Sequence, residues 1–206
     1  MAFYVIFWSK MNTDFVETPL ATKFGTLNIR VYADVQGKET IALCTENLDP
    51  TTPPLVRIHS ECMTGDTFGS LHCDCGEQLE RSLEQIVEHG NGVLIYLRQE
   101  GRGIGLFEKI KSYQLQHAGH DTFEANVLLG HEPDKRTYEN AKMVLDGFGI
   151  ERIRLITNSP SKVANISNLG IEVVERVPLI IAPNKHNERY LASKRDKFNH
   201  FLDAGE

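Results

Sequence analysis

Apolar and polar positions alternate along residues 24–45, in two runs that a short polar turn separates. The first run reads FGTLNIRVYAD, the second reads TIALCT, and the turn is Gln36-Gly37-Lys38. A period of two is typical of strands that bury one face and expose the other. The pattern therefore predicts a β-hairpin near the N-terminus.

The period changes after residue 76, where apolar side chains recur every three to four positions. Leu79, Leu83, Ile86 and Val87 share one face of a predicted helix over residues 77–89. Two short apolar runs, at residues 55–59 and 92–97, predict buried strands on either side of this helix. Strand and helix thus begin to alternate here.

The alternation continues to residue 177. We expect a helix from the glycine-rich turn to about residue 118, a helix over 135–148 and a strand over 153–157. Asn158 and Pro160 are typical of a helix start, and Gly170 of its end, before a strand over 171–177. A charged helix should follow from about Asn187. The sequence therefore predicts an α/β protein with a mixed β-sheet and helices on both faces.

The first ten residues are apolar but too short to span a bilayer, and they lack the basic start of a secretory signal. We expect Met11 to be the functional start and residues 1–19 to be a poorly ordered extension. Residues 20–206 then form a single catalytic domain. No other stretch of the chain predicts a membrane span.

The net charge of −6 argues against a nucleic-acid polymer as a partner. An anionic small molecule would need a local group of Arg and Lys side chains instead. The chain has four cysteines, and three of them are crowded between residues 62 and 75. This usage suits a reducing cytoplasm and a metal better than a set of disulfides.

The crowded cysteines are Cys62, Cys73 and Cys75, spaced C-x10-C-x-C. Three thiolates can hold one zinc ion and leave its fourth position open, which is typical of a catalytic site. In the alternative hypothesis, His59 or His72 supplies a fourth ligand and the zinc only stabilises the loop. The tight C-x-C pair and the neighbouring carboxylate of Glu61 favour the catalytic interpretation.

A glycine-rich turn, Gly101-Arg102-Gly103-Ile104-Gly105, joins a predicted strand to a predicted helix. Glycines allow backbone amides to approach a phosphate at a helix N-terminus, although a plain tight turn is the alternative. Arg57, Thr157 and Lys162 lie in or after other predicted strands, where ligands of open α/β sheets bind. Together these residues predict a binding site for a triphosphate. Taken alone, Asp134 would cap a helix and Tyr113 would be a core aromatic.

Four segments match a known family. They are Arg57–Asp66, Cys73–Gly76, Arg98–Leu106 and Asp121–Asn126. Together they resemble GTP cyclohydrolase II, and the likeness runs from about Leu20 to Leu202. The resemblance implies the first step of riboflavin synthesis, in which GTP loses C8 as formate and its outer two phosphates as pyrophosphate. It also implies a homodimer and a magnesium ion with the triphosphate.

The resemblance assigns roles to individual residues. Cys62, Cys73 and Cys75 match zinc ligands, Asp134 and Arg136 match a pair that acts at the α-phosphate, and Tyr113 matches a catalytic tyrosine. In the family the arginine is the proposed nucleophile, a demanding role for a guanidinium that is always protonated. The positions that match GTP contacts are Arg57, Glu61, Gln78, Glu100, Gly101, Arg102, Thr122, Thr157 and Lys162.

The chain departs from the family pattern beside the cysteines. His72 stands where an arginine is common, and Glu77 replaces a small or apolar residue. These changes leave two other hypotheses open. One is a paralogue that opens the ring but retains the formyl group or acts on a related nucleotide. The other is a silent nucleotide-binding protein in which His72 closes the zinc site.

Overall fold

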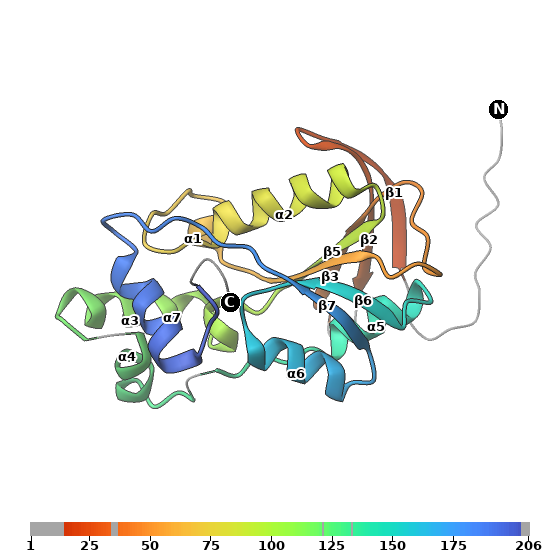
Figure 1. Ribbon diagram of the computed structural model, residues 1–206. Helices are drawn as coiled ribbons and strands as arrows, with labels where there is room; N and C mark the ends of the chain where they lie inside the picture. The colour runs from red at the N-terminus through yellow and green to blue at the C-terminus, as the bar shows by residue number, and fades with distance from the viewer. Residues whose placement is uncertain (1–14, 34–36, 121, 133, 203–206) are drawn as a thin grey trace.

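A computed structural model describes residues 15–33, 37–120, 122–132 and 134–202. Seven of its strands form one sheet in the order β1-β2-β3-β5-β4-β6-β7 (Figure 1). The first three strands and β5 pair antiparallel, while β5, β4, β6 and β7 pair parallel. The strands are β1 Phe15–Thr22, β2 Gly25–Ala33, β3 Glu39–Cys44, β4 Leu55–Ser60, β5 Gly92–Leu97, β6 Arg152–Ile156 and β7 Glu172–Val177.

Helices pack on both faces of this sheet, as the sequence predicts (Figure 1). The helices of the structure are α1 Met63–Asp66, α2 Cys75–His89, α3 Leu106–His117, α4 Thr122–Leu128, α5 Glu139–Gly147, α6 Pro160–Asn168 and α7 Glu188–Phe198. Helix α2 covers one face and helices α5 and α6 the other, while α1, α3, α4 and α7 lie at one end of the molecule. A short 3-10 helix, Glu100–Gly103, precedes α3. The mixed sheet and its predicted hairpin, β2 with β3, are confirmed.

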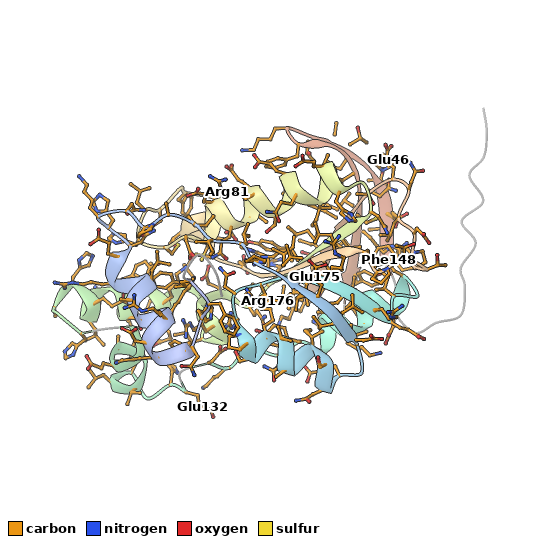
Figure 2. All side chains as sticks on the ribbon, viewed as in Figure 1. Glu46, Arg81, Glu132, Phe148, Glu175 and Arg176 are labelled. Carbon is orange, nitrogen blue, oxygen red and sulfur yellow. The ribbon has the colours of Figure 1, made fainter. Side chains whose placement is uncertain are left out.

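Two apolar clusters hold the layers together, and side chains fill the space on either side of the sheet (Figure 2). Leu83 and Ile86 of α2 pack on one face, against Leu27 and Leu94 of the sheet. The cluster on the other face contains Leu145 of α5 and Ile166 of α6, which pack with Val56 and Ile58 of β4. The parallel strands β4, β5 and β6 run through the middle, so their carboxyl ends meet at one edge of the molecule.

Three predictions need correction. Residues 15–19, predicted as part of an N-terminal extension, belong to β1, because this segment pairs with β2 from Phe15↔Tyr32 onward. Residues 1–14 lie outside the described part of the chain. The short helix α4 was not predicted.

The helix predicted over residues 135–148 begins only at Glu139. The backbone N–H of Lys135 instead donates to the carbonyl oxygen of Arg102, at 3.0 Å. Asp134 is therefore not a helix cap: its carboxylate accepts from the backbone N–H of Arg136, at 3.0 Å. The tertiary contact with the glycine-rich turn holds this segment out of the helix.

Within the part of the chain that the structure describes, no helix is both long enough and apolar enough to cross a membrane.

Candidate functional site

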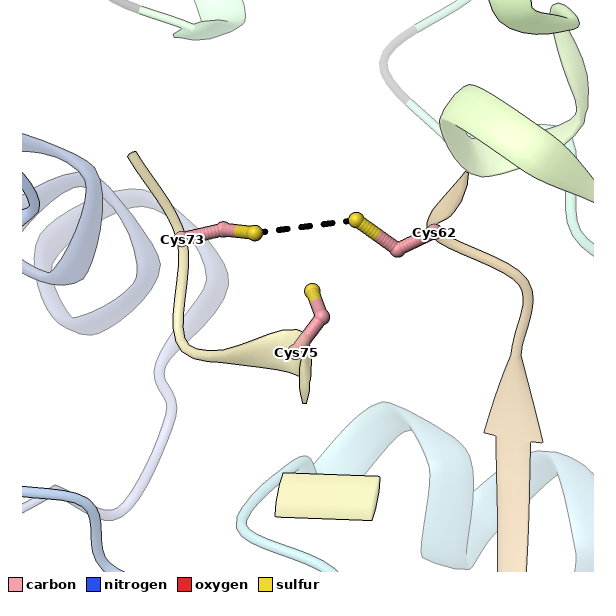
Figure 3. Close-up of side chains that lie close together, drawn as sticks. All are labelled: Cys62, Cys73 and Cys75. Carbon is pink, nitrogen blue, oxygen red and sulfur yellow. Dashed lines mark hydrogen bonds between the residues drawn. The ribbon is translucent and has the colours of Figure 1, made fainter. Parts of the chain in front are cut away.

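The three crowded cysteines converge at the carboxyl end of β4. Cys62 follows β4, Cys73 lies in the loop before α2, and Cys75 is the first residue of α2. Figure 3 shows their thiol groups pointing toward one another. The Sγ atoms of Cys62 and Cys73 are 3.6 Å apart, and all three Sγ atoms lie within 4.8 Å of one another. This group could hold a metal ion.

Two glycines allow the cysteine loops to approach. A Cβ atom on Gly65 would lie 2.9 Å from the Sγ of Cys73, and one on Gly76 would meet the carbonyl oxygen of Gly65. Any larger side chain at either position would push the loops apart. The glycines of the two cysteine motifs therefore set the spacing of the thiols.

One thiol of the group is prepared to be a thiolate. Hydrogen bonds from the thiols of Cys73 and Cys75, and the charge of Lys109, lower the pKa of Cys62. The bond to Cys62 in turn raises the pKa of Cys73 to about 11. The Nζ atom of Lys109 donates to the Sγ of Cys62 at 3.1 Å and to a carboxylate oxygen of Glu100 at 2.8 Å. Soft thiolates in this arrangement fit zinc.

Neither histidine considered as a fourth ligand joins the thiols. Among the described side chains, the group contains the three cysteines and nothing else. The Nε2 atom of His59 lies 3.1 Å from both carboxylate oxygens of Asp66. His72 is exposed, and its ring packs near the rings of His117 and His186. These three thiols would hold a metal ion and leave room for one more ligand on it.

A cavity opens beside the thiols, at the carboxyl ends of β4, β5 and β6. It brings together residues that are far apart in the sequence, from Arg57 to His200. Of the predicted site residues, the lining includes Arg57, Glu61, Cys62, Cys73, Cys75, Gln78, Glu100, Gly101, Arg102, Tyr113, Arg136, Thr157 and Lys162. Asp134 is not part of this lining, but its carboxylate accepts a hydrogen bond from Arg136, which is. Thr122 is the first residue of α4, and its side chain lies outside the described part of the structure.

The cavity is strongly cationic, although the chain as a whole is acidic. Six of its lining residues are basic and only two, Glu61 and Glu100, are acidic. The basic ones are Arg57, Arg102, Lys109, Arg136, Lys162 and Lys194. Burial lowers the pKa of Lys162 far below its usual range, and the nearby charges of Arg57 and Arg136 lower it further. Such a cluster is costly unless an anion binds it.

Two of these cations also have buried nitrogen atoms without a hydrogen-bond partner in the described structure. They are the Nε atom of Arg57 and one terminal nitrogen of Arg102. Buried donors are normally satisfied in folded proteins, so unsatisfied ones in a cavity indicate a place for a ligand. The ligand that these donors fit is an anion with several oxygen atoms.

Two of the side chains that were predicted to contact the substrate make hydrogen bonds within the protein. Gln78 accepts a hydrogen bond from Arg57 at 2.6 Å and donates one to Asp74 at 2.5 Å. Glu100 accepts from the backbone N–H of Met63 at 2.6 Å, beside the first cysteine, and from that of Gly101 at 2.7 Å. Both side chains therefore join parts of the cavity wall to one another.

The glycine-rich turn has an unusual backbone. Gly101 and Arg102 both adopt left-handed conformations, with φ of 61° and 60°. This conformation is easy for glycine but costs energy for arginine, and strain of this kind gathers at functional sites. It places the guanidinium of Arg102 over the ring of Phe198, 3.9 Å from the ring centre, at the cavity wall.

Asp134 and Arg136 form an ion pair whose closest atoms are 2.5 Å apart. Burial alone would lower the pKa of Arg136, but the hydrogen bonds to Asp134 outweigh it and the net shift is upward. The same pair holds the pKa of Asp134 below its usual value, against the effect of burial. Arg136 is thus held firmly as a cation.

Tyr113 and Glu61 line the cavity near the thiols. The Tyr113 hydroxyl lies 3.4 Å from the hydroxyl of Thr64, and burial raises the pKa of Tyr113. Burial also raises the pKa of Glu61, despite the opposing charge of Arg98. The tyrosine is therefore a cavity residue as well as a packed aromatic.

Several lining residues were not predicted from the sequence, and four of them have ionisable side chains: Lys109, Tyr190, Lys194 and His200. A local signal existed for Lys109, since it shares a helix face with Tyr113, four residues later. Tyr190 and Lys194 also share one helix face. Nothing in the charged tail, however, indicates that this face is the buried one.

The comparison with protein families matches residues 13–178 to the GTP cyclohydrolase II family. GTP cyclohydrolase-2 of Acinetobacter baylyi is 49% identical over 199 residues, which cover 95% of this chain and all of that protein. The riboflavin biosynthesis protein RibBA of Phocaeicola vulgatus is 46% identical over 188 residues, 91% of this chain. The chain spans only about half (46%) of the length of that relative.

Among solved structures, a two-domain 3,4-dihydroxy-2-butanone 4-phosphate synthase from A. baumannii matches 84% of this chain and 42% of that one. The identity is 15% and the TM-score is 0.46, a likeness too distant to say anything of fold or function. The family match covers most of the chain and agrees with the relatives of high identity. This chain therefore belongs to the GTP cyclohydrolase II family.

Proposed function

We propose that the protein hydrolyses GTP, opening the imidazole ring at C8 and releasing formate and pyrophosphate. The remaining product is a diaminopyrimidine ribosylamine 5′-phosphate, which enters riboflavin synthesis. The observation that carries this proposal is one cavity that combines three clustered thiols with a ring of basic side chains. Curated relatives named GTP cyclohydrolase-2 support the choice of reaction.

The cations of the cavity would hold the triphosphate. Arg57 lies within β4, Arg102 in the 3-10 helix after β5 and Lys162 in the first turn of α6, after β6. All three line the cavity at the carboxyl ends of these strands, where phosphates bind in α/β proteins. Their buried donors match the oxygen-rich surface of a triphosphate. A magnesium ion would accompany the phosphates, as the family resemblance implies. Thr157 and Gly101, which also line the cavity, would complete the contacts.

Cys62, Cys73 and Cys75 would hold zinc, with one position left open toward the cavity. Bound zinc supplies Lewis acidity and lowers the pKa of a coordinated water. Lys109 keeps the Cys62 thiol ready to bind the ion as a thiolate. Glu61 and Tyr113 line the same part of the cavity and would move protons or orient the purine.

For Arg136 we propose the role of a cation at the α-phosphate. Its ion pair with Asp134 raises its pKa, which disfavours the neutral guanidine that a nucleophile requires. Asp134 would orient Arg136 toward the phosphate, because its own lowered pKa makes it a poor base. A water molecule then becomes the better nucleophile for pyrophosphate release.

We also propose that the protein forms a homodimer. Several large apolar side chains are exposed on one copy, among them Val16 at 72% and Phe107 at 75%. Val16 lies on β1 and Phe107 on α3, at opposite ends of the molecule, and a second copy would cover one of the two. Light scattering on the purified protein measures the mass of the assembly directly.

The test is to incubate the purified protein with GTP and magnesium while measuring zinc content, formate and pyrophosphate. The proposal predicts about one zinc per chain and equal amounts of formate and pyrophosphate. A ring-opened product that keeps its formyl group would identify a paralogue with altered chemistry. Bound zinc with neither product would reject the proposal and indicate a silent nucleotide-binding protein.

A further inference from the structure

The C-terminal segment, residues 179–202, lies beyond the part of the chain that matches the family. It nevertheless forms part of the cavity wall, through Tyr190 and Lys194 of α7 and through His200 after it. In Figure 1, α7 lies at the same end of the molecule as α1 and α3, which border the thiols and the glycine-rich turn. The segment is therefore placed to meet a bound nucleotide.

Three contacts anchor this segment to three different walls of the cavity. The Nζ atom of Lys194 donates to a carboxylate oxygen of Asp74 at 2.6 Å, between the second and third cysteines. The ring of Phe198 packs under the guanidinium of Arg102 in the glycine-rich turn. The backbone N–H of Phe201 donates to the carbonyl oxygen of Asn158, after β6, at 2.9 Å. The segment thus connects the cysteine loop at Asp74 with the glycine-rich turn at Arg102 and with the turn after β6 at Asn158.

Lys194 is the member of this segment best suited to bind a ligand. Its side chain is 9% exposed, and that of Asp74 is 2% exposed, so their ion pair is buried. An ammonium group has three donors, and within the described part of the chain that of Lys194 donates to Asp74. Lys194 lines the same cavity as Arg57 and Lys162, with its ammonium over the ring of Tyr190.

We propose that Lys194 is a substrate-binding residue that contacts the phosphates of the nucleotide, with Asp74 holding it in position. This inference rests on the proposed function, since it assumes a nucleotide phosphate in the cavity. The remaining donors of Lys194 would bind phosphate oxygens while its bond to Asp74 persists. Residues 13–178 match the family model, whereas the match to GTP cyclohydrolase-2 of Acinetobacter baylyi covers 95% of this chain and so extends into this segment.

Binding of GTP and of guanosine, measured by calorimetry on zinc-loaded protein, tests the proposal with the variant K194M. A non-hydrolysable GTP analogue avoids turnover. We expect the affinity for the analogue to fall about 10- to 100-fold, as for other charged hydrogen bonds, with guanosine binding unchanged. The variant K194R, which keeps the charge, should recover part of the loss. R195M is the matched control, because Arg195 is exposed on the same helix and pairs with Asp196.

K194M leaves the carboxylate of Asp74 buried without its partner, so the pair D74N and D74N/K194M is measured alongside it. Removing Lys194 in the D74N background should still weaken binding of the analogue and spare guanosine. If Lys194 only supports the metal loop, K194M will lose zinc or weaken both ligands equally, and the proposal is wrong. Unchanged affinity for the analogue in both backgrounds would also overturn it.

The failure of this inference differs from a failure of the proposed function. Wild-type protein that releases formate from GTP, together with a K194M variant of normal GTP affinity, would reject the role of Lys194 alone. Wild-type protein that binds guanosine and the GTP analogue equally would show that no phosphate site exists. That result would reject both.

Discussion

The two faces of strand β4 are both buried, but one faces an apolar cluster and the other faces the cavity. Val56 and Ile58 are fully buried in the apolar cluster beneath α5 and α6. Arg57 and His59, which alternate with them, are 6% and 2% exposed and line the cavity. Burial is nearly equal on the two faces, but one face is apolar and close-packed while the other holds charges and unpaired donors.

The difference shows what each face contributes. Apolar burial stabilises the fold at about 25 cal/mol per Å². Buried like charges do the opposite, and they are kept at sites that bind ligands. Substitutions in the core should therefore lower stability and spare the chemistry. Substitutions of cavity residues should remove binding or catalysis, and loss of a cation that has no acidic partner should leave stability unchanged or raised.

The largest effect is expected for Cys73→Ser. Loss of one thiolate should reduce zinc from about one per chain to almost none and slow formate release more than about a thousandfold. The apolar clusters do not contain Cys73, so circular dichroism should show the native fold. Cys44→Ser is the control, because Cys44 is buried in the sheet away from the cavity. Full zinc content in Cys73→Ser would contradict the assignment of the ligands.

For Arg136→Met we expect turnover to fall about 100- to 1000-fold, since a preformed cation at the reacting phosphate is removed. Unfolding temperature should fall slightly, because the ion pair with Asp134 that raises the pKa of Arg136 is lost. Steady-state kinetics and thermal unfolding measure the two effects. Arg152→Met, an exposed arginine that pairs with Glu172, should change neither. Normal turnover in Arg136→Met would remove this residue from the mechanism.

Leu145→Ala tests the contribution of the apolar cluster to stability. Leu145 is fully buried between α5 and the sheet, and the cavity that its loss creates should lower the free energy of unfolding by about 2–5 kcal/mol. Urea unfolding measures this change. At a temperature where the variant is folded, its KM for GTP should equal that of the wild type. A large change in KM with little loss of stability would show that core and cavity are not separable.

Lys162→Met should weaken GTP binding and yet stabilise the empty protein slightly. Burial lowers the pKa of Lys162, whereas the unfolded chain keeps the ordinary value of about 10.4. Between the lowered pKa of the folded state and the ordinary pKa of the unfolded state, Lys162 binds a proton only when the chain is unfolded. Within this pH range the free energy of unfolding of the wild type therefore falls as the pH falls. The variant should lose this part of the pH dependence in urea unfolding between pH 8 and 10. Identical pH dependence in both proteins would mean that Lys162 is charged in the fold.

Most of the sheet follows from local patterns in the sequence. The strand over residues 92–97 and the hairpin of β2 and β3 were predictable because apolar runs and alternation report burial directly. The start of α5 was not, because a hydrogen bond from Lys135 to the distant Arg102 decides it. Local pattern carries no information on such a contact.

The site shows the same division. Motifs around Cys62 and Arg102 predicted part of the cavity lining, because each short segment contributes several residues together. Lys194 could not be predicted, since its partner Asp74 is 120 positions away and the tail reads as a solvated charged helix. Only the folded chain brings the two together.

The central claim is that the three cysteines hold a metal that the ring-opening reaction needs. The most direct measurement removes zinc with a chelator, adds it back in steps and follows formate release from GTP. The account predicts that formate release is absent without zinc, rises with each addition and stops rising at about one zinc per chain. Formate release that persists without zinc, or zinc binding that restores no formate release, would contradict the account.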